Sequence, residues 1–134
     1  MPQPTIRHLL VDADGCCALL NDSDGLLGAM RAAAASVGAN EVGQTDARYV
    51  PHGITAVLFL AESHILISTW PEHKLALVDI QFCDPKMNPE DAWAVLKEAL
   101  GAQTAKLTWV QRGPRAQSES PRTSATKRAS SWPR

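Results

Sequence analysis

The sequence has few cysteines and no long hydrophobic run, and both features narrow the class of protein. The three cysteines are odd in number, with Cys16 and Cys17 adjacent and Cys83 far away, so they predict no disulfide framework. This favours a reducing, cytoplasmic location. No apolar run reaches the roughly 18 residues that a membrane helix needs, and the N-terminal residues lack the basic-then-apolar order of a secretory signal. We therefore expect a cytoplasmic protein with no membrane partner.

The length and charge predict one domain followed by a tail. The chain has 134 residues, of which 45% are hydrophobic and 20% charged, and a domain of this size can bury a core without disulfides or metal. The net charge is −1, but residues 113–134 carry five basic side chains against Glu119 alone. This segment is rich in Ser, Pro and Arg, so we expect a disordered basic tail after a domain over residues 1–112. The acidic body has no basic stripe, so no nucleic-acid partner is expected.

Hydrophobic patterning predicts six strands and two helices in the order β-α-β-β-β-β-α-β. The strands are expected over residues 6–13, 41–50, two runs within 54–70, 75–83 and 105–111, and the helices over 24–38 and from Asn88 onward. Four successive strands with short links must be largely antiparallel, because parallel neighbours need long crossovers. The prediction is an α+β two-layer sandwich, a mostly antiparallel sheet with the helices on one face. Two helices leave the other face uncovered, and we expect a second copy to pack there as a homodimer.

Three polar residues, Glu62-Ser63-His64, interrupt the most hydrophobic part of the chain. Polar groups in such a place must be partnered or used, and a hairpin turn is the simplest explanation. A hydrolase that pairs Ser63 with His64 is disfavoured, because adjacent strand residues point to opposite faces. One metal site is conceivable from the histidines and cysteines, namely His8, Cys16, Cys17 and His64. Their spacing matches no strong metal motif, so no metal is expected.

Residues 61–72, Ala-Glu-Ser-His-Ile-Leu-Ile-Ser-Thr-Trp-Pro-Glu, carry a resemblance to a known family. This block resembles the signature of the small prokaryotic S-adenosylmethionine decarboxylases, which are pyruvoyl enzymes of spermidine biosynthesis. The resemblance continues over residues 51–55 before the block, 78–83 after it and 7–12 near the start, and it covers about residues 7–112. The predicted order of strands and helices agrees with the family's sandwich.

The resemblance implies a reaction in which the chain cuts itself. Ser63 would attack the carbonyl of Glu62, convert that peptide bond to an ester and then eliminate, so that the second fragment begins with a pyruvoyl group. This group would form a Schiff base with the amine of S-adenosylmethionine and serve as the electron sink, with no pyridoxal phosphate and no metal. Cys83 would return a proton after carbon dioxide leaves, since a cysteine thiol is mostly protonated at neutral pH.

The resemblance also assigns roles at four further positions. Thr55 matches a hydroxyl residue that assists self-processing, Tyr49 an aromatic that stacks on adenine, and Glu72 a carboxylate that accepts hydrogen bonds from ribose. Ser68 matches a processing position but departs from the pattern, because the family carries a histidine there as the base for self-processing. A serine hydroxyl is a poor base at neutral pH, and loss of a positioned base typically costs 10²- to 10⁴-fold in rate.

These departures leave two alternatives open. Residues 73–75 read His-Lys-Leu where the family often has Tyr-Gly-Tyr, and residues 13–15, at the end of the first strand, read Ala-Asp-Gly where a bulky or aromatic residue is common. The substrate could therefore be ornithine or arginine, with the same pyruvoyl chemistry. Because of Ser68, the chain could instead be an unprocessed, non-catalytic homologue that acts as a regulatory subunit.

Overall fold

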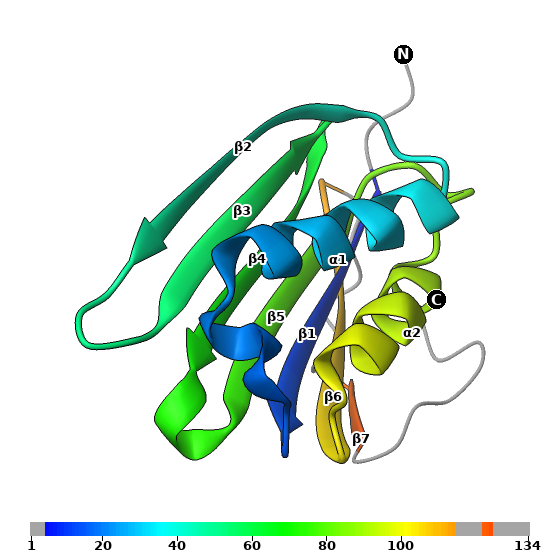
Figure 1. Cartoon of the computed structure of the whole chain (residues 1–134). Helices are drawn as coiled ribbons and strands as arrows, with labels where there is room; N and C mark the ends of the chain where they lie inside the picture. The colour runs from blue at the N-terminus through cyan, green and yellow to red at the C-terminus, as the bar shows by residue number, and fades with distance from the viewer. Residues whose placement is uncertain (1–4, 115–121, 125–134) are drawn as a thin grey trace.

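Two α-helices pack on one face of a single antiparallel sheet in the computed structural model, which describes residues 5–114 and 122–124 (Figure 1). The strands are β1 Ile6–Asp14, β2 Glu41–Arg48, β3 Ile54–Leu60, β4 Ser63–Trp70, β5 Leu75–Phe82, β6 Thr104–Arg112 and β7 Arg122–Ser124. The helices are α1 Ser23–Ser36 and α2 Pro89–Leu100, with short 3₁₀ turns η1 Ala18–Asn21 and η2 Pro71–His73. None of the helices in the described residues is long and apolar enough to cross a membrane.

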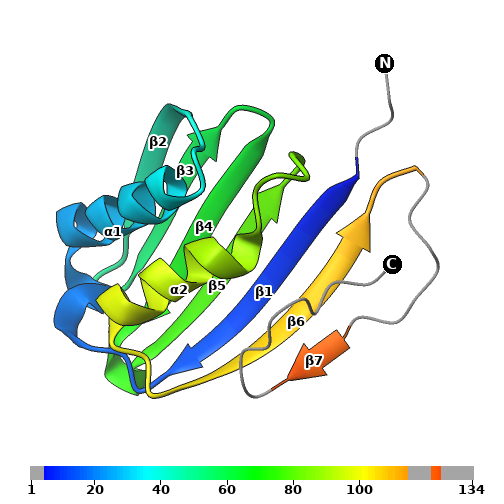
Figure 2. The same ribbon diagram turned by 90° about the vertical axis from the view of Figure 1, so that its right-hand side faces the viewer.

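The predicted fold class and element order are confirmed. The described strands form one sheet in the order β2-β3-β4-β5-β1-β6-β7, and every neighbouring pair is antiparallel. β1 lies between β5 and β6, because α2 carries the chain across β1 before β6 begins (Figure 2). The three-residue strand β7 pairs with β6 and falls within the segment 113–134 that is expected to be disordered. Residues 115–121 and 125–134 of that segment lie outside the described residues.

Each helix begins at a cap that the sequence indicates. The Asp22 carboxylate accepts a hydrogen bond of 3.0 Å from the Gly25 backbone N–H at the start of α1. Asn88 does the same for Glu90 N at the start of α2, where Pro89 occupies the first helical position. Gly101 ends α2 in the left-handed conformation, with φ of 64°, which glycine adopts without steric cost.

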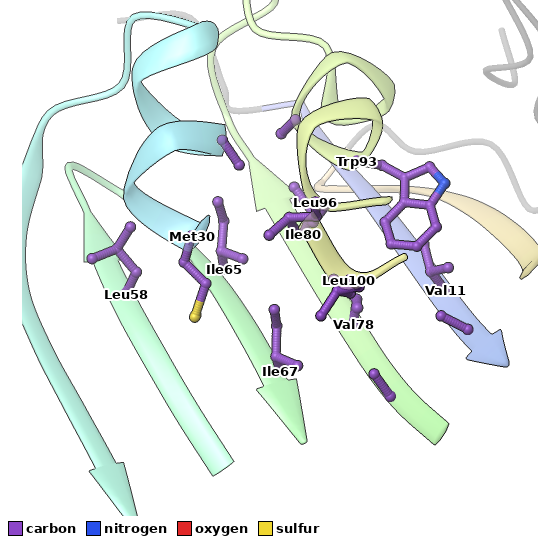
Figure 3. Packing of buried hydrophobic residues seen from close by; sticks show 14 of the residues in the cluster. Val11, Met30, Leu58, Ile65, Ile67, Val78, Ile80, Trp93, Leu96 and Leu100 are labelled. Carbon is purple, nitrogen blue, oxygen red and sulfur yellow. The ribbon is translucent and has the colours of Figure 1, made fainter. Parts of the chain in front are cut away.

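The hydrophobic core lies between the two helices and the sheet (Figure 3). Alternate residues of the central strands point toward the helices, because side chains on a strand alternate between its two faces. Core residues labelled in Figure 3 are Val11, Met30, Leu58, Ile65, Ile67, Val78, Ile80, Trp93, Leu96 and Leu100. All ten are buried, so the helix-facing side of the sheet is fixed by apolar packing.

The opposite side of the sheet, here called the open face, is covered by no helix of the described residues. One row of cross-strand partners runs across this face through Val57, Leu66, Asp79 and Leu10. Several apolar side chains on it are partly or well exposed: Leu10, Val57, Phe59, Leu66, Trp70, Leu77 and Val110. Phe59 is 44% exposed and Leu77 is 37% exposed, which is unusual for large apolar residues on central strands.

Candidate functional site

The first group of candidate residues gathers at the turn between β3 and β4. Leu60 pairs with Ser63, so the turn has only two residues, Ala61 and Glu62, and Ser63 and His64 already belong to β4. The three-residue polar break expected from the sequence is therefore shorter than predicted. Glu62 has φ of 59°, a left-handed conformation that costs a residue with a Cβ roughly 1 kcal/mol. The strained residue is the one whose carbonyl the resemblance assigns as the point of attack.

Ser63, Cys83 and Glu62, to which the resemblance assigns self-processing and proton return, contact one another. The Cys83 backbone N–H donates to Ser63 Oγ at 3.3 Å, and Ser63 Oγ lies 3.7 Å from Cys83 Sγ. The Cys83 thiol donates to Glu62 Oε2 at 3.8 Å. These residues line a pocket of about 240 Å³, here called the first pocket, together with Ala39, Asn40, Leu60, Ala61, Asp84 and Met87. The first pocket therefore holds a serine hydroxyl and a cysteine thiol in contact.

Arg7 fixes the loop that follows Cys83, a role that the sequence analysis missed. Its guanidinium donates from Nη2 to the carbonyl oxygens of Pro85 at 2.6 Å and Met87 at 2.8 Å, with a longer contact of 3.5 Å to that of Asp84. Burial lowers the pKa of Arg7, and the carboxylates of Asp84 and Glu90 act in the opposite direction. The N-terminal strand β1 thus holds the chain next to Cys83.

A second group of candidates gathers where β3 begins and β4 ends. Thr55 and Ser68 are cross-strand partners, and their hydroxyl oxygens lie 3.0 Å apart. The Tyr49 hydroxyl donates to Thr55 Oγ1 at 3.1 Å, which makes a chain of three hydroxyl groups. These three residues line a pocket of about 340 Å³, here called the second pocket. Its other lining residues are His52, Gly53, Thr69, Trp70 and Glu72.

Glu72 lies in the second pocket opposite His52, which the sequence analysis did not single out. His52 Nε2 is 3.2 Å from Glu72 Oε1. His52 belongs to the turn between β2 and β3, which is held by a hydrogen bond of 2.8 Å from Tyr49 N to the carbonyl oxygen of Gly53. The resemblance included residues 51–55, but it assigned no function to His52.

The two pockets lie at opposite ends of β4. Ser63 is the first residue of this strand and Ser68 the sixth, a separation of about 17 Å at the usual rise of ~3.3 Å per residue. One chain therefore brings Ser63, Cys83 and Glu62 together, and separately Tyr49, Thr55, Ser68 and Glu72. It does not bring the two groups into contact.

The open face carries a third polar group between the pockets. His8 Nε2 hydrogen-bonds Asp79 Oδ1, and His64 Nε2 lies 3.4 Å from the same oxygen. Burial alone would raise the pKa of Asp79, but the hydrogen bonds from His64 and His8 outweigh it and lower that pKa. Asp79 is a residue that the sequence analysis quoted only as part of the resemblance.

This third group is the place where the described residues could hold a metal ion, since the three ligand atoms lie within 4.8 Å of one another. However, Arg112 Nη1 lies 3.5 Å from His8 Nδ1, which places the ring proton of His8 on Nε2, toward Asp79. Cys16 and Cys17 do not join the group: Cys17 N bonds the Leu100 carbonyl oxygen, and burial raises the pKa of the Cys16 thiol to about 11. All three cysteines are free thiols.

The fold and the first pocket define a two-layer α+β protein with a serine and a cysteine in contact at the tip of a central hairpin. Residues 7–113 match the family model described as S-adenosylmethionine decarboxylase. The chain belongs to the S-adenosylmethionine decarboxylase family, a family of pyruvoyl-dependent carboxy-lyases. The resemblance in the sequence is thereby confirmed, and it covers nearly the same residues as expected.

Individual relatives agree with this assignment. An S-adenosylmethionine decarboxylase proenzyme of Acidithiobacillus ferrooxidans is 39% identical over 94 residues, which is 70% of this chain and 71% of that protein. The protein of the same name from Clostridium tetani is 36% identical over 108 residues, covering 80% of this chain and 86% of its own. Among solved structures, the adenosylmethionine decarboxylase from Aquifex aeolicus matches with a TM-score of 0.76 and 28% identity, over 89% of this chain and 98% of that one.

Proposed function

We propose that this chain is a cytoplasmic S-adenosylmethionine decarboxylase of spermidine biosynthesis that matures by cutting itself between Glu62 and Ser63. The single observation that carries this proposal is the contact of Ser63 Oγ with Cys83, beside a left-handed Glu62. A serine that follows a strained residue in a tight turn is suited to cleave the bond between them, because cleavage frees the strained residue from the turn.

Maturation proceeds through an acyl transfer, an elimination, a tautomerisation and a hydrolysis. Ser63 Oγ bonds to the carbonyl carbon of Glu62 while the peptide C–N bond breaks, which gives an ester and a free amine on residue 63. A base then takes the Cα proton of residue 63, the Cβ–Oγ bond breaks, and Glu62 leaves as the carboxylate end of the first fragment. The resulting enamine tautomerises to an imine, and water replaces its nitrogen as ammonia, leaving a pyruvoyl group at residue 63.

The first pocket fits this group, because it already accommodates the side chain from which the group is made. The pyruvoyl ketone supplies an electron sink for the pair of electrons released when carbon dioxide leaves. Cys83 is the proton donor, since its Sγ lies 3.7 Å from Ser63 Oγ. Arg7 holds the loop after Cys83 and so keeps this residue next to position 63.

The second pocket takes the nucleoside part of the substrate in this proposal. Tyr49 is more than half exposed and offers an aromatic face for adenine and for the sulfonium cation. Glu72 offers carboxylate oxygens to the ribose hydroxyls. Thr55 and Ser68, also in this pocket, assist the maturation step.

A homodimer joins the two pockets. They lie at opposite ends of β4, so two copies that pack their open faces with the strands reversed bring the second pocket of each to the strand end that carries the first pocket of the other. The partly exposed apolar residues of the open face, including Phe59 and Leu77, supply the contact surface. Each dimer then contains two equal sites, and each site draws residues from both copies.

Release of labelled carbon dioxide from the purified protein tests this function. S-adenosylmethionine, ornithine and arginine, each labelled at the carboxyl carbon, are incubated side by side with the protein and with its Ser63→Ala variant. The proposal expects release from S-adenosylmethionine alone, and none from the variant. Release from ornithine or arginine alone would replace the substrate assignment, and no release from any of the three would favour a non-catalytic homologue.

A further inference from the structure

We infer that His52 is the base of self-processing in this chain, taking over the task that the family's histidine performs where this chain has Ser68. The inference rests on the proposed self-cleavage and names the group that removes the Cα proton of residue 63. Within one chain the two pockets lie at opposite ends of β4, so in the proposed homodimer the His52 that acts belongs to the second copy.

The hydroxyl of Ser68 cannot take this proton. Its Oγ lies in the hydrogen-bonded chain that runs from Tyr49 through Thr55, and every member of that chain is a neutral hydroxyl group. The aliphatic hydroxyls of Ser68 and Thr55 do not ionise near neutral pH. This chain of hydroxyls can donate hydrogen bonds to the attacked carbonyl, but it supplies no base.

Of the four histidines, only His52 lies where the base of self-processing is expected in this proposal. His8 and His64 are both engaged by Asp79 on the open face, between the two pockets. His73 does not line the second pocket. His52 lines this pocket together with Thr55 and Ser68, so it occupies the same space as the two residues that the resemblance assigns to processing.

Glu72 orients His52 for this task. Glu72 Oε1 lies 3.2 Å from His52 Nε2, an ion-pair distance, and a carboxylate only accepts hydrogen bonds. This neighbour favours the tautomer of His52 that carries its proton on Nε2 and its lone pair on Nδ1. The same carboxylate stabilises the imidazolium that forms when Nδ1 takes up a proton, the arrangement that makes histidine an effective base.

The loop around His52 is fixed on both sides. The carbonyl oxygen of Gly53 accepts from Tyr49 N at 2.8 Å, and Gly53 N donates to Asn21 Oδ1 at 3.3 Å. Gly53 has φ of 112°, and a Cβ there would lie 3.3 Å from the Thr69 carbonyl oxygen, so this turn requires glycine. His52 therefore projects from a constrained turn, which is what a positioned base requires.

The proton and electrons balance in the proposed step. Nδ1 of His52 takes the Cα proton of residue 63 after the ester has formed. The electron pair of that C–H bond becomes the Cα–Cβ double bond, the Cβ–Oγ bond breaks, and its pair leaves with the Glu62 carboxylate. The imidazolium later gives its proton to the departing ammonia, which regenerates the neutral base.

A time course of cleavage after refolding from denaturant tests the inference, with the fragments followed by mass. The variants are His52→Gln, the matched control His73→Gln, and the double variant His52→Gln/Ser68→His. Each sample is also split and treated with hydroxylamine, which cleaves the ester but leaves the peptide bond between Glu62 and Ser63 intact. A variant that has lost only the base accumulates the ester, which hydroxylamine cleaves. A variant in which Ser63 is misplaced forms no ester and resists hydroxylamine.

The inference expects His52→Gln to slow cleavage by about 10²-fold or more and to accumulate chain that hydroxylamine cuts at this bond. The His73→Gln control should stay within about twofold of the unmodified protein, and Ser68→His should restore cleavage to His52→Gln. If His52→Gln cleaves at the unmodified rate, the inference is wrong and self-cleavage stands. If His52→Gln stays intact, resists hydroxylamine and is not rescued, His52 serves folding and the inference is also wrong. An unmodified chain that never cleaves overturns self-cleavage and this inference together.

Discussion

The contact between Arg7 and the loop after Cys83 gives a prediction whose size follows from the structure. The guanidinium makes two short hydrogen bonds, 2.6 Å to the Pro85 carbonyl oxygen and 2.8 Å to that of Met87. These bonds join the first strand to a loop about 78 residues later in the chain. Replacing Arg7 by Met keeps the length of the side chain but removes every donor.

A hydrogen bond to a charged group contributes about 1.5–3 kcal/mol to stability. The Pro85 contact is exposed, so water can replace it, whereas the Met87 contact is partly buried. We therefore expect Arg7→Met to lower the free energy of unfolding by about 2 kcal/mol, mostly through the Met87 bond. Turnover should fall as well, because the loop beside Cys83 loses its anchor.

Urea unfolding measures this loss in the Ser63→Ala background, where the chain stays intact, at one fixed protein concentration because a dimer's stability depends on it. The matched control is Arg48→Met. Arg48 has a side chain that is 68% exposed and pairs with Asp46 at 3.6 Å, so its loss should cost less than about 0.5 kcal/mol. Equal losses for the two variants would refute the reasoning, since it attributes the difference to burial and to the loop carbonyls.

Three further predictions concern the first pocket, the open face and a strained turn. Cys83→Ser should still cleave itself but release carbon dioxide about 10²-fold more slowly; an unchanged rate of release would exclude the thiol as proton donor. Hydrogen bonds from His64 and His8 outweigh burial and lower the pKa of Asp79, so ionised Asp79 stabilises the fold above about pH 4 and this stabilisation is lost as the pH falls. Asp79→Asn should accordingly flatten the acid side of the curve of unfolding free energy against pH, and an unchanged curve would contradict this. Lys74 has φ of 53°, so Lys74→Gly should raise the melting temperature slightly, by relief of about 1 kcal/mol of strain, and a lower value would argue against strain.

The fold was predictable because its signals are local. Alternating apolar residues, helix caps such as Asp22 and Asn88, and short links between four successive strands determine the elements and their antiparallel pairing. The turn between β3 and β4 was predicted one residue too long. The polarity of a residue indicates that it is exposed, but it does not show whether that residue pairs with the neighbouring strand. Ser63 is polar but pairs with Leu60, which leaves only Ala61 and Glu62 in the turn.

The candidate site was predictable only in part. Ser63 and Cys83 were singled out from a resemblance, and their contact could not follow from periodicity, since it depends on how β4 and β5 align over 20 residues of chain. Arg7 and His52 were missed because their partners lie far away in the sequence. Nothing local to Arg7 indicates the loop carbonyls that it binds, and nothing local to His52 indicates Glu72.

Self-cleavage between Glu62 and Ser63 is the central claim, and the mass of the purified protein under denaturing conditions tests it most directly. The account predicts two fragments, residues 1–62 and residues 63–134, the second with a blocked N-terminus that reacts with hydrazines as a ketone does. A single chain of 134 residues that stays intact after long incubation would contradict the account.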